Sequence, residues 1–402
     1  MGKFVVLVLD GFGVGAMDDV RDTRPDDIGA NTALHIFEYM SGLRLPNLER
    51  MGLMNAVGRE TEFMKYSDSA TWGRSMLMHI GADTFLGHQE IMGTLPRPAF
   101  SEPFGNRIDE VKELLEKSGF EVSVRYGSRN RFLVVEDAVV IGDNMECDPG
   151  QIVNVTSVLD KISFEKVLSI GRTVRSATKV PRVITSGGRK TSIEKLISAV
   201  EERDGIYMGL NAPKSGVTDH GFIVVHMGYG ADSRVQVPTC VGEKGIPVFL
   251  VGKVADIVEN PYGTSFPMVS TKQVMEKVYE LSRCKGDAFI CANVQETDLA
   301  GHDQDAKKYA MRLVSADEGI GCMLPNLGKD DVLLVMADHG NDPTIGHSKH
   351  TRELVPVLVY GKKVKKGILG VRETLSDVGT TVCDYFNCRL PENGTSFLDF
   401  LL

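Results

Sequence analysis

The 402-residue sequence lacks the features that mark secreted or membrane-embedded proteins. Its seven cysteines are odd in number and irregularly spaced, and no two of them form a C-x-x-C pair. We therefore expect reduced thiols in a cytoplasmic protein rather than a disulfide framework. The apolar run over residues 4–9 is too short for a signal peptide or a membrane span, so no membrane partner is expected.

The sequence also has no block of lysine or arginine residues, and its formal net charge is −9. This charge disfavours a nucleic acid as a partner. An acidic protein that handles phosphate groups must create a local positive field, and bound metal ions are one way to create it. Repeats and low-complexity segments are missing too, whereas the length exceeds what one hydrophobic core usually covers. We therefore expect two domains.

Short apolar runs that end in Gly, Asp or Asn predict an α/β fold. Runs of this length suit strands that are buried on both faces of a mostly parallel sheet. Apolar residues at helical spacing, such as Val274, Val278 and Leu281, lie between the runs. The strand-like runs are residues 3–11, 246–253, 287–298, 331–340 and 354–361.

The middle of the chain has a different pattern and predicts a second domain. Helices and strands alternate there in an α+β order, and Pro- and Gly-rich segments flank the region. We expect residues 1–95 and 217–402 to form a discontinuous core, with residues 96–216 inserted as a cap domain.

Metal-binding residue types gather at the predicted strand ends, where parallel α/β sheets bind ligands. Three of the nine histidines lie within residues 338–350. Taken alone, each Asp is more often a helix cap or turn residue, and each His a structural residue. Together, three Asp and three His at three strand ends can hold two divalent cations. These residues are Asp10, Asp298, His302, Asp338, His339 and His350.

Paired divalent cations suit phosphoryl transfer, because they clamp the attacking and leaving oxygens. His and carboxylate ligands without Cys fit Mn²⁺, Mg²⁺ or Zn²⁺, and the sequence does not separate these. The segment 79–93 offers a nucleophile, since Gly81 and Gly87 flank Thr84 and permit close approach of the backbone. The alternative is that Thr84 is an ordinary helix N-cap.

The motifs in these segments resemble those of known enzymes. "ADHGNDP" (337–343), "HTRE" (350–353) and "VPVLVYG" (355–361) are similar to the alkaline phosphatase superfamily of two-metal phosphotransferases. "LVLDGFGVG", "DTFLGHQEIMG" and "VGKVADI" are more closely similar to the phosphopentomutase family. The resemblance implies an alkaline-phosphatase-like core, with a mostly parallel sheet sandwiched by helices, and an inserted α+β cap.

The resemblance also divides the candidate metal ligands between two ions. His347 has no counterpart in this pattern and is left out. The matched sets are Asp298, His302 and His350 for one ion, and Asp10, Asp338 and His339 for the other.

Further roles follow from the same resemblance. Thr84 matches the residue that carries a phosphoryl group, and Lys253 and Arg182 match contacts to the substrate phosphate. The alternatives are that Lys253 is a solvated lysine and that Arg182 is an ion-paired surface arginine. His88 and Glu90 lie close to Thr84 in sequence and either orient site residues or have buried structural roles.

The implied reaction moves a phosphate between C1 and C5 of ribose or deoxyribose, through phospho-Thr84 and a bisphosphate that turns around in the closed site. The implied cofactors are two divalent cations, with Mn²⁺ favoured over Mg²⁺ or Zn²⁺, and a sugar bisphosphate as activator. The partner would be a small-molecule sugar phosphate. The sequence leaves the oligomeric state open.

The sequence departs from the family pattern at several points. "DLAGH" (298–302) is one residue shorter than the usual D-x-x-x-G-H, and Gln89 stands where the family has Trp. "LNAPKSGVTDHGF" (210–222) replaces an arginine-rich stretch. The metal set is thus retained and the substrate set altered, so phosphoryl transfer is predicted more firmly than pentose specificity.

Two other functions remain open at this point. A phosphatase or phosphodiesterase would use the same metals and Thr84, but would release a hydrolysis product. A non-catalytic, metal-stabilised binding protein is the third reading, although Thr84 and all matched ligand positions are present.

Overall fold

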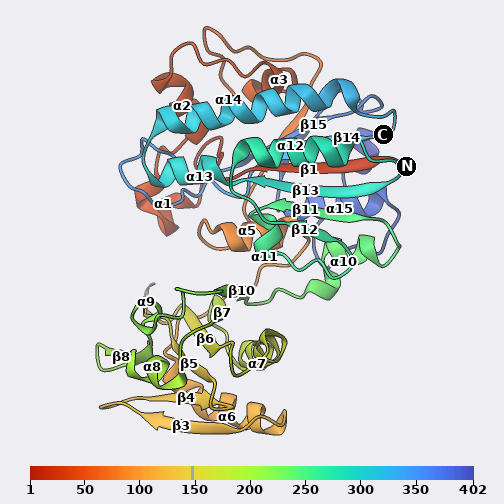
Figure 1. Cartoon of the computed structure of the whole chain (residues 1–402). Coiled ribbons are helices and arrows are strands. Elements are labelled where there is room, and N and C mark those ends of the chain that lie inside the picture. Colours follow the sequence, from red (N-terminus) through yellow and green to blue (C-terminus); the bar gives the residue numbers. More distant parts are fainter. Residues whose placement is uncertain (146–148) are drawn as a thin grey trace. The chain divides into compact units, whose positions relative to one another are not determined.

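The computed structural model describes residues 1–145 and 149–402, which form two compact units. Unit 1 comprises Met1–Pro96 and Asp232–Leu402, and unit 2 comprises Arg97–Ala231 (Figure 1). Cys147 lies outside the described residues, and the other six cysteines are free thiols. Within the described residues, no helix is long and apolar enough to cross a membrane.

Unit 1 is built on an eight-stranded sheet with the order β12-β11-β13-β1-β14-β15-β2-β16. Neighbouring strands are parallel except that β15 runs antiparallel to both β14 and β2. The predicted α/β class with a mostly parallel sheet is therefore confirmed. The strands are β1 (Lys3–Leu9), β2 (Thr71–Ser75), β11 (Val248–Gly252), β12 (Thr264–Phe266), β13 (Ala288–Val294), β14 (Val332–Met336), β15 (Val355–Tyr360) and β16 (Gly367–Arg372).

The three central strands bring their carboxyl ends to one level. Every residue of β1, β13 and β14 is buried, which explains their continuous apolar sequences. Val8 is in register with Asn293 of β13 and Met336 of β14. The residues that follow these strands therefore emerge together at one edge of the sheet.

Helices flank this sheet. α14 packs against α12 and α13, and α15 packs against α5 and α10 (Figure 1). Val274, Val278 and Leu281 are the buried face of α12, as their spacing predicts. The helices of unit 1 are α1 (Val20–Thr23), α2 (Thr32–Tyr39), α3 (Pro46–Arg50), α4 (Leu53–Val57), α5 (Thr84–Ile91), α10 (Val237–Gly242), α11 (Val254–Ile257), α12 (Thr271–Ser282), α13 (Gln295–His302), α14 (Ala306–Met323), α15 (Ser376–Tyr385) and α16 (Leu398–Leu401).

Unit 2 is an α+β unit with its own apolar core. Its six-stranded sheet has the order β10-β7-β6-β5-β4-β3, and β8 and β9 form a separate hairpin pair. Its strands are β3 (Val122–Tyr126), β4 (Arg131–Val135), β5 (Val139–Asp143), β6 (Ile152–Val158), β7 (Arg182–Gly188), β8 (Val200–Arg203), β9 (Tyr207–Leu210) and β10 (Ile223–Gly228). Its helices are α6 (Ile108–Lys117), α7 (Phe164–Ala177), α8 (Ile193–Ser198) and α9 (Ala212–Ser215).

The second junction between the units lies later than the expected position 217. Residues 217–231 belong to unit 2, because β10 pairs with β7 through the whole of Ile223–Gly228. The Pro- and Gly-containing segment that predicted a junction forms α9 and the turn after it, inside unit 2. A local break in pattern therefore marked a turn within the inserted unit rather than its end.

We expect the central sheet to dominate the stability of unit 1. Leu334 in β14 is fully buried, whereas Leu390 is 51% exposed in a loop. Leu334→Ala should lower the free energy of unfolding by about 3 kcal/mol, because it removes buried apolar area and leaves a cavity. Leu390→Ala, the matched control, should change it by less than about 0.5 kcal/mol.

Denaturant titration followed by tryptophan fluorescence measures this difference. The single tryptophan, Trp72, lies in β2 and therefore reports on unit 1. Equal losses from the two substitutions would contradict the assignment of β14 to the core.

Candidate active site

Asp10 follows β1 directly and is fully buried. Its Oδ2 atom accepts hydrogen bonds from Lys253 Nζ (2.9 Å) and Asn293 Nδ2 (3.0 Å). Its Oδ1 atom is buried and has no hydrogen-bond partner among the described residues. One oxygen of this carboxylate is thus held by the protein, and the other is left for a ligand.

Asp338 follows β14, and its carboxylate lies against the end of β1. Asp338 Oδ1 accepts a hydrogen bond from Gly11 N (3.2 Å), and Oδ2 accepts one from Thr84 Oγ1 (2.7 Å). His88 Nδ1 is 3.2 Å from the same Oδ2 atom. The predicted nucleophile and a predicted metal ligand are therefore direct neighbours.

Asp298 lies in α13, directly after β13, and is 2% exposed. Asn341 Nδ2 donates to its Oδ1 atom (2.8 Å), and Lys253 Nζ donates to its Oδ2 atom (3.2 Å). The Nε2 atoms of His302 and His350 lie 3.5 Å from Oδ2 and 3.3 Å from Oδ1, respectively. The one-residue-shorter "DLAGH" segment thus still places Asp298 and His302 side by side, one helical turn apart.

The three candidate histidine ligands are oriented by main-chain carbonyls. Nδ1 of His302 is 2.7 Å from Ser348 O, Nδ1 of His339 is 2.9 Å from Gly340 O, and Nδ1 of His350 is 2.9 Å from Ala82 O. A carbonyl oxygen only accepts, so each neutral ring carries its hydrogen on Nδ1 and leaves the Nε2 lone pair free. Metal-bound histidines in proteins are commonly oriented in this way.

Two groups of these side chains offer ligand atoms within 4.8 Å of one another: Asp298, His339 and His350, and Asp10, Asp338 and His339. His339 belongs to both groups, whereas the resemblance assigned it to the second ion alone. His302 adjoins the first group, since its Nε2 atom is 3.0 Å from that of His350.

The donor set fits divalent cations. His339 Nε2 and Asp10 Oδ1 lie 3.5 Å apart, and both are buried without a hydrogen-bond partner in the described part of the chain. Such orphaned acceptors are costly unless something binds them. Carboxylate and imidazole donors without thiolate suit Mn²⁺, Mg²⁺ or Zn²⁺.

Burial and mutual repulsion shape the charge states of the site. Burial and the neighbouring Asp338 carboxylate raise the pKa of Asp10 to about 7. Burial lowers the pKa of His339 to about 4, which keeps its imidazole neutral and able to bind a metal. Burial would lower the pKa of Lys253, but the nearby carboxylates, led by Asp10 and Asp298, raise it above its usual value. Lys253 therefore stays a cation.

Thr84 is the first residue of α5, and its hydroxyl faces Asp338 rather than capping the helix. The N-cap is Asp83, whose side chain accepts a hydrogen bond from Leu86 N at 2.9 Å. Glycine at position 87 permits this approach, because a Cβ there would lie 2.7 Å from the carbonyl oxygen of Asp338. The cap interpretation of Thr84 is therefore wrong for this structure.

Two buried asparagines belong to the site and were not predicted. Asn293 is the next-to-last residue of β13 and bridges Asp10 and His88, with its Nδ2 atom 2.9 Å from His88 Nε2. Asn341 Nδ2 donates to both the carbonyl and a carboxylate oxygen of Asp298. The signal was present, since Asn293 stands near a strand end and Asn341 stands inside the "DHGND" motif.

His347 and Arg182, which were also singled out from the sequence, are not among the contacts described above. His347 belongs to neither ligand group, and its Nε2 atom is 3.2 Å from Asp27 Oδ1. Arg182 begins β7 in unit 2, and its role in binding substrate stays a prediction.

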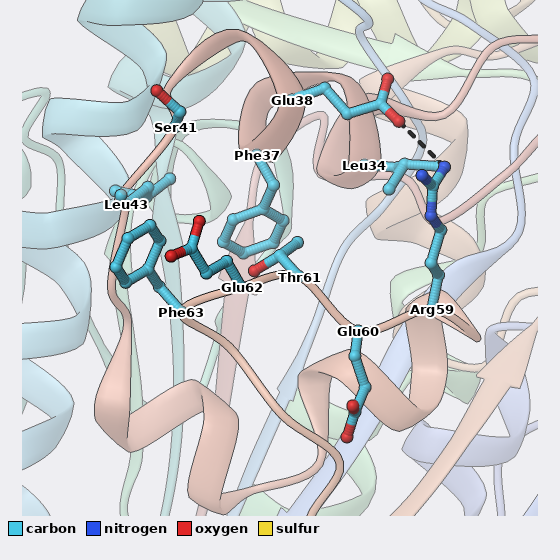
Figure 2. Close-up of a pocket in the computed structure, with 11 residues that line it drawn as sticks. Leu34, Phe37, Glu38, Ser41, Leu43, Arg59, Glu60, Thr61, Glu62 and Phe63 are labelled. Carbon is cyan, nitrogen blue, oxygen red and sulfur yellow. Dashed lines mark hydrogen bonds and ion pairs between the residues drawn. The ribbon is translucent and has the colours of Figure 1, made fainter.

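A separate pocket in unit 1 lies between α2 and residues 59–63 (Figure 2). Phe37 and Phe63 line it, and an exposed ion pair joins Glu38 and Arg59 (2.9 Å). None of the candidate metal ligands lines this pocket. Its mixed lining gives it no evident chemistry.

The family model and the sequence relatives agree with a metal site of the kind described above. The model of the metalloenzyme superfamily matches residues 2–390. The chain is similar to the phosphopentomutase of Symbiobacterium thermophilum, with 29% identity over 411 residues that cover 99% of this chain and 98% of the relative. It is also similar to the phosphopentomutase of Clostridioides difficile, with 28% identity and 99% coverage of each chain.

Among solved structures, the chain is similar to Leishmania mexicana phosphoglycerate mutase. That match has a TM-score of 0.47 and 12% identity, and it covers 98% of this chain and 96% of the other. The PH0037 protein of Pyrococcus horikoshii matches with a TM-score of 0.44 and 15% identity, covering 96% and 97% of the two chains.

The pKa of Asp10 predicts pH-dependent metal binding. Below pH 7 the Asp10 carboxyl holds a proton that a cation must displace. The pKa values of the candidate ligands His302 and His350 are also raised, so the affinity for Mn²⁺ should fall at least about tenfold per pH unit below 7. Titration calorimetry with Mn²⁺ at pH values from 5.5 to 8.5 measures this affinity. The range extends about one and a half pH units on either side of pH 7.

Asp10→Asn should weaken Mn²⁺ binding about 100-fold and make its pH dependence less steep, because it deletes one of the ligands that bind protons, while His302 and His350 remain. Asp256→Asn, at an exposed position of α11, is the matched control and should leave both unchanged. An unaltered affinity in Asp10→Asn would remove Asp10 from the ligand set.

Proposed function

We propose that this chain, which belongs to the metalloenzyme superfamily, is a metal-dependent mutase that moves a phosphoryl group between C1 and C5 of ribose or deoxyribose. Its similarity to phosphopentomutases over the whole chain supports the reaction type. The observation that carries the proposal is the Thr84 hydroxyl, held 2.7 Å from Asp338 beside the candidate metal ligands.

Two divalent cations complete the site in this proposal, with Mn²⁺ favoured and Mg²⁺ or Zn²⁺ also compatible with the donors. Bound there, they would offset charge on the phosphoryl oxygens and lower the pKa of a coordinated hydroxyl. In this proposal Asp298, His302 and His350 would hold one ion and Asp10, Asp338 and His339 the other. His339 also lies within reach of the first group.

Thr84 serves as the carrier of the phosphoryl group. A sugar bisphosphate loads it: Thr84 Oγ1 attacks one phosphorus and the bond from that phosphorus to the sugar oxygen breaks. The proton of the Thr84 hydroxyl passes to the leaving sugar oxygen, so that phospho-Thr84 and a sugar monophosphate form. A hydroxyl of the sugar monophosphate then attacks phospho-Thr84, the P–Oγ1 bond breaks, the hydroxyl proton passes to Thr84 Oγ1, and a bisphosphate results. After the bisphosphate turns around, Thr84 takes back the other phosphoryl group, so no phosphate is lost to water.

Neighbouring side chains prepare Thr84 for this role. Asp338 Oδ2 accepts the hydrogen bond from the Thr84 hydroxyl and so fixes the direction of its lone pairs. His88 Nδ1 is 2.8 Å from the carbonyl oxygen of Thr84 and so helps to hold the main chain of this residue. Lys253, 14% exposed beside Asp10 and Asp298, is a cation that a substrate phosphate can reach.

Hydrolysis is the alternative outcome at the same residues, with water in place of the sugar hydroxyl. Residues 210–222, which replace the family's arginine-rich stretch, leave the choice of sugar open. The small-molecule substrate and the cytoplasmic location both stay predictions from the sequence.

The direct test follows the phosphorus atoms. The protein is incubated with Mn²⁺, ribose 5-phosphate and a trace of ribose 1,5-bisphosphate, then treated with EDTA and examined by phosphorus NMR. We expect interconversion of the 1- and 5-phosphates without inorganic phosphate. Thr84→Ala should lower the rate by at least about 1,000-fold, because it removes the nucleophile.

Thr84→Ser is the matched variant, since it keeps a hydroxyl and should keep part of the activity, and Thr344→Ala controls for loss of an exposed threonine. Steady release of inorganic phosphate would identify a hydrolase instead. Unchanged esters with phosphorylated Thr84 detected by mass spectrometry would keep the chemistry and reject the sugar. Full activity in Thr84→Ala would reject the phosphothreonine.

A further inference from the structure

Arg352 makes an unusual set of contacts with the segment that precedes Thr84. It is 6% exposed, and Nη1 donates to the carbonyl oxygens of His79 and Gly81, both at 2.7 Å. Nη2 donates to the carbonyl oxygen of Leu77 at 3.0 Å. One guanidinium group thus binds the carbonyls of three alternate residues. We name residues 77–82 the nucleophile loop.

One carboxylate, that of Asp19, pairs with the same guanidinium through its Nε and Nη2 atoms. Arg352 Nε lies 2.9 and 2.8 Å from the two carboxylate oxygens of Asp19. The backbone N–H of Arg352 donates to Asp27 Oδ2 at 2.9 Å. Asp19 therefore holds the side chain of Arg352 and Asp27 holds its main chain, and from this position the guanidinium binds the nucleophile loop.

Glu90 of α5 holds the same loop by accepting hydrogen bonds from the backbone N–H groups of the loop. The backbone N–H groups of Met78 and His79 donate to its two carboxylate oxygens, each at 3.0 Å, and His79 Nδ1 lies 2.7 Å from Oε2. Glu90 is fully buried. A buried cation thus binds the carbonyls of the loop, and a buried carboxylate binds its N–H groups.

The loop connects two parts of the candidate active site. It leads through Asp83 into Thr84, and the carbonyl oxygen of Ala82 accepts from His350 Nδ1 at 2.9 Å. His350 is in turn only two residues from Arg352 in the chain. A shift of the loop would therefore move the hydroxyl of Thr84 and turn the ring of His350 together.

We propose that Arg352 is a positioning residue that sets both the nucleophile Thr84 and the candidate ligand His350 by clamping the carbonyls of the nucleophile loop. The catalytic half of this inference rests on the proposed function, and the His350 half does not. Lysine cannot replace this clamp, because it lacks the planar fork of donors that reaches several acceptors at once. A displacement of about 1 Å at a reacting group can cost 100-fold in rate.

The test uses the full chain with Arg352→Ala and Arg352→Lys. Hydrogen–deuterium exchange of residues 77–83 should rise at least about tenfold in both variants, because the loop loses its clamp. Mn²⁺ affinity should fall about tenfold, since His350 loses its orienting carbonyl. Interconversion of the pentose phosphates should lose about 100-fold in kcat with little change in KM, because the defect lies in the position of Thr84.

Chemical rescue distinguishes positioning from a general loss of structure. Guanidinium ion at non-denaturing concentration should restore part of the activity and the Mn²⁺ affinity of Arg352→Ala, and should not help Arg352→Lys, whose side chain fills the site. Arg372→Lys is the matched control, because Arg372 is also a partly buried arginine paired with a carboxylate, Asp377 at 2.6 Å. It should leave loop exchange and Mn²⁺ affinity as in the wild type.

The proposal is overturned if folded Arg352→Lys shows wild-type exchange in residues 77–83 and Mn²⁺ affinity within about twofold of the wild type. Equal effects from Arg372→Lys would also overturn it, since they would indicate general destabilisation. If Arg352→Ala does not fold, Arg352→Lys decides both readouts. A wild-type protein inactive on pentose phosphates would reject the proposed function, whereas exchange and Mn²⁺ affinity would still decide the role of Arg352.

Discussion

Three buried carboxylates at one edge of a sheet are the constraint on which the site depends. Asp10, Asp298 and Asp338 are each at most 2% exposed, and their ligand atoms lie within a few ångströms of one another or of shared histidines. Burial of like charges is costly unless cations, protons or hydrogen bonds compensate it. Lys253 supplies one positive charge, so two of the three negative charges remain, and two divalent cations would more than offset them.

Buried side chains hold the carboxylates of Asp10 and Asp298, and main-chain groups set the directions of the histidines around them. Each candidate histidine is aimed by a carbonyl oxygen, and Asp338 is held by the N–H of Gly11. The carbonyl of Gly340 belongs to a bridge with Thr351, whereas those of Ala82 and Ser348 lie in loops, and main-chain groups held in place lose little entropy when they bind. A site built in this way is preorganised before any ligand arrives, which is what electrostatic stabilisation of a phosphoryl group requires.

The sequence predicted the parts of this site that follow from sheet topology. Asp10 and Asp338 could be placed together because both follow strands that read as buried and parallel. Arg352 could not be found in that way, since its partners in residues 77–81 are carbonyl groups, which carry no residue-specific signal. The end of unit 2 was missed for a similar reason: β10 is held by backbone pairing with β7, and the pattern of residues 217–231 does not reveal that partner.

Gln89, which stands where the resemblance implies a Trp, supports α5 and does not contact the reacting groups. Gln89 Nε2 donates to the carbonyl oxygen of Ile257 at 2.7 Å, and its Oε1 accepts from Gln236 Nε2 at 2.6 Å. Gln236 also donates to Thr94 Oγ1 at 2.8 Å, so buried amides join α5 to α10 and to the end of α11. The two amide side chains satisfy each other's hydrogen-bonding groups across these helices. A single indole N–H could satisfy only one acceptor. The helix that carries Thr84 is therefore held at both ends, by this amide chain near its carboxyl end and by Asp83 at its start.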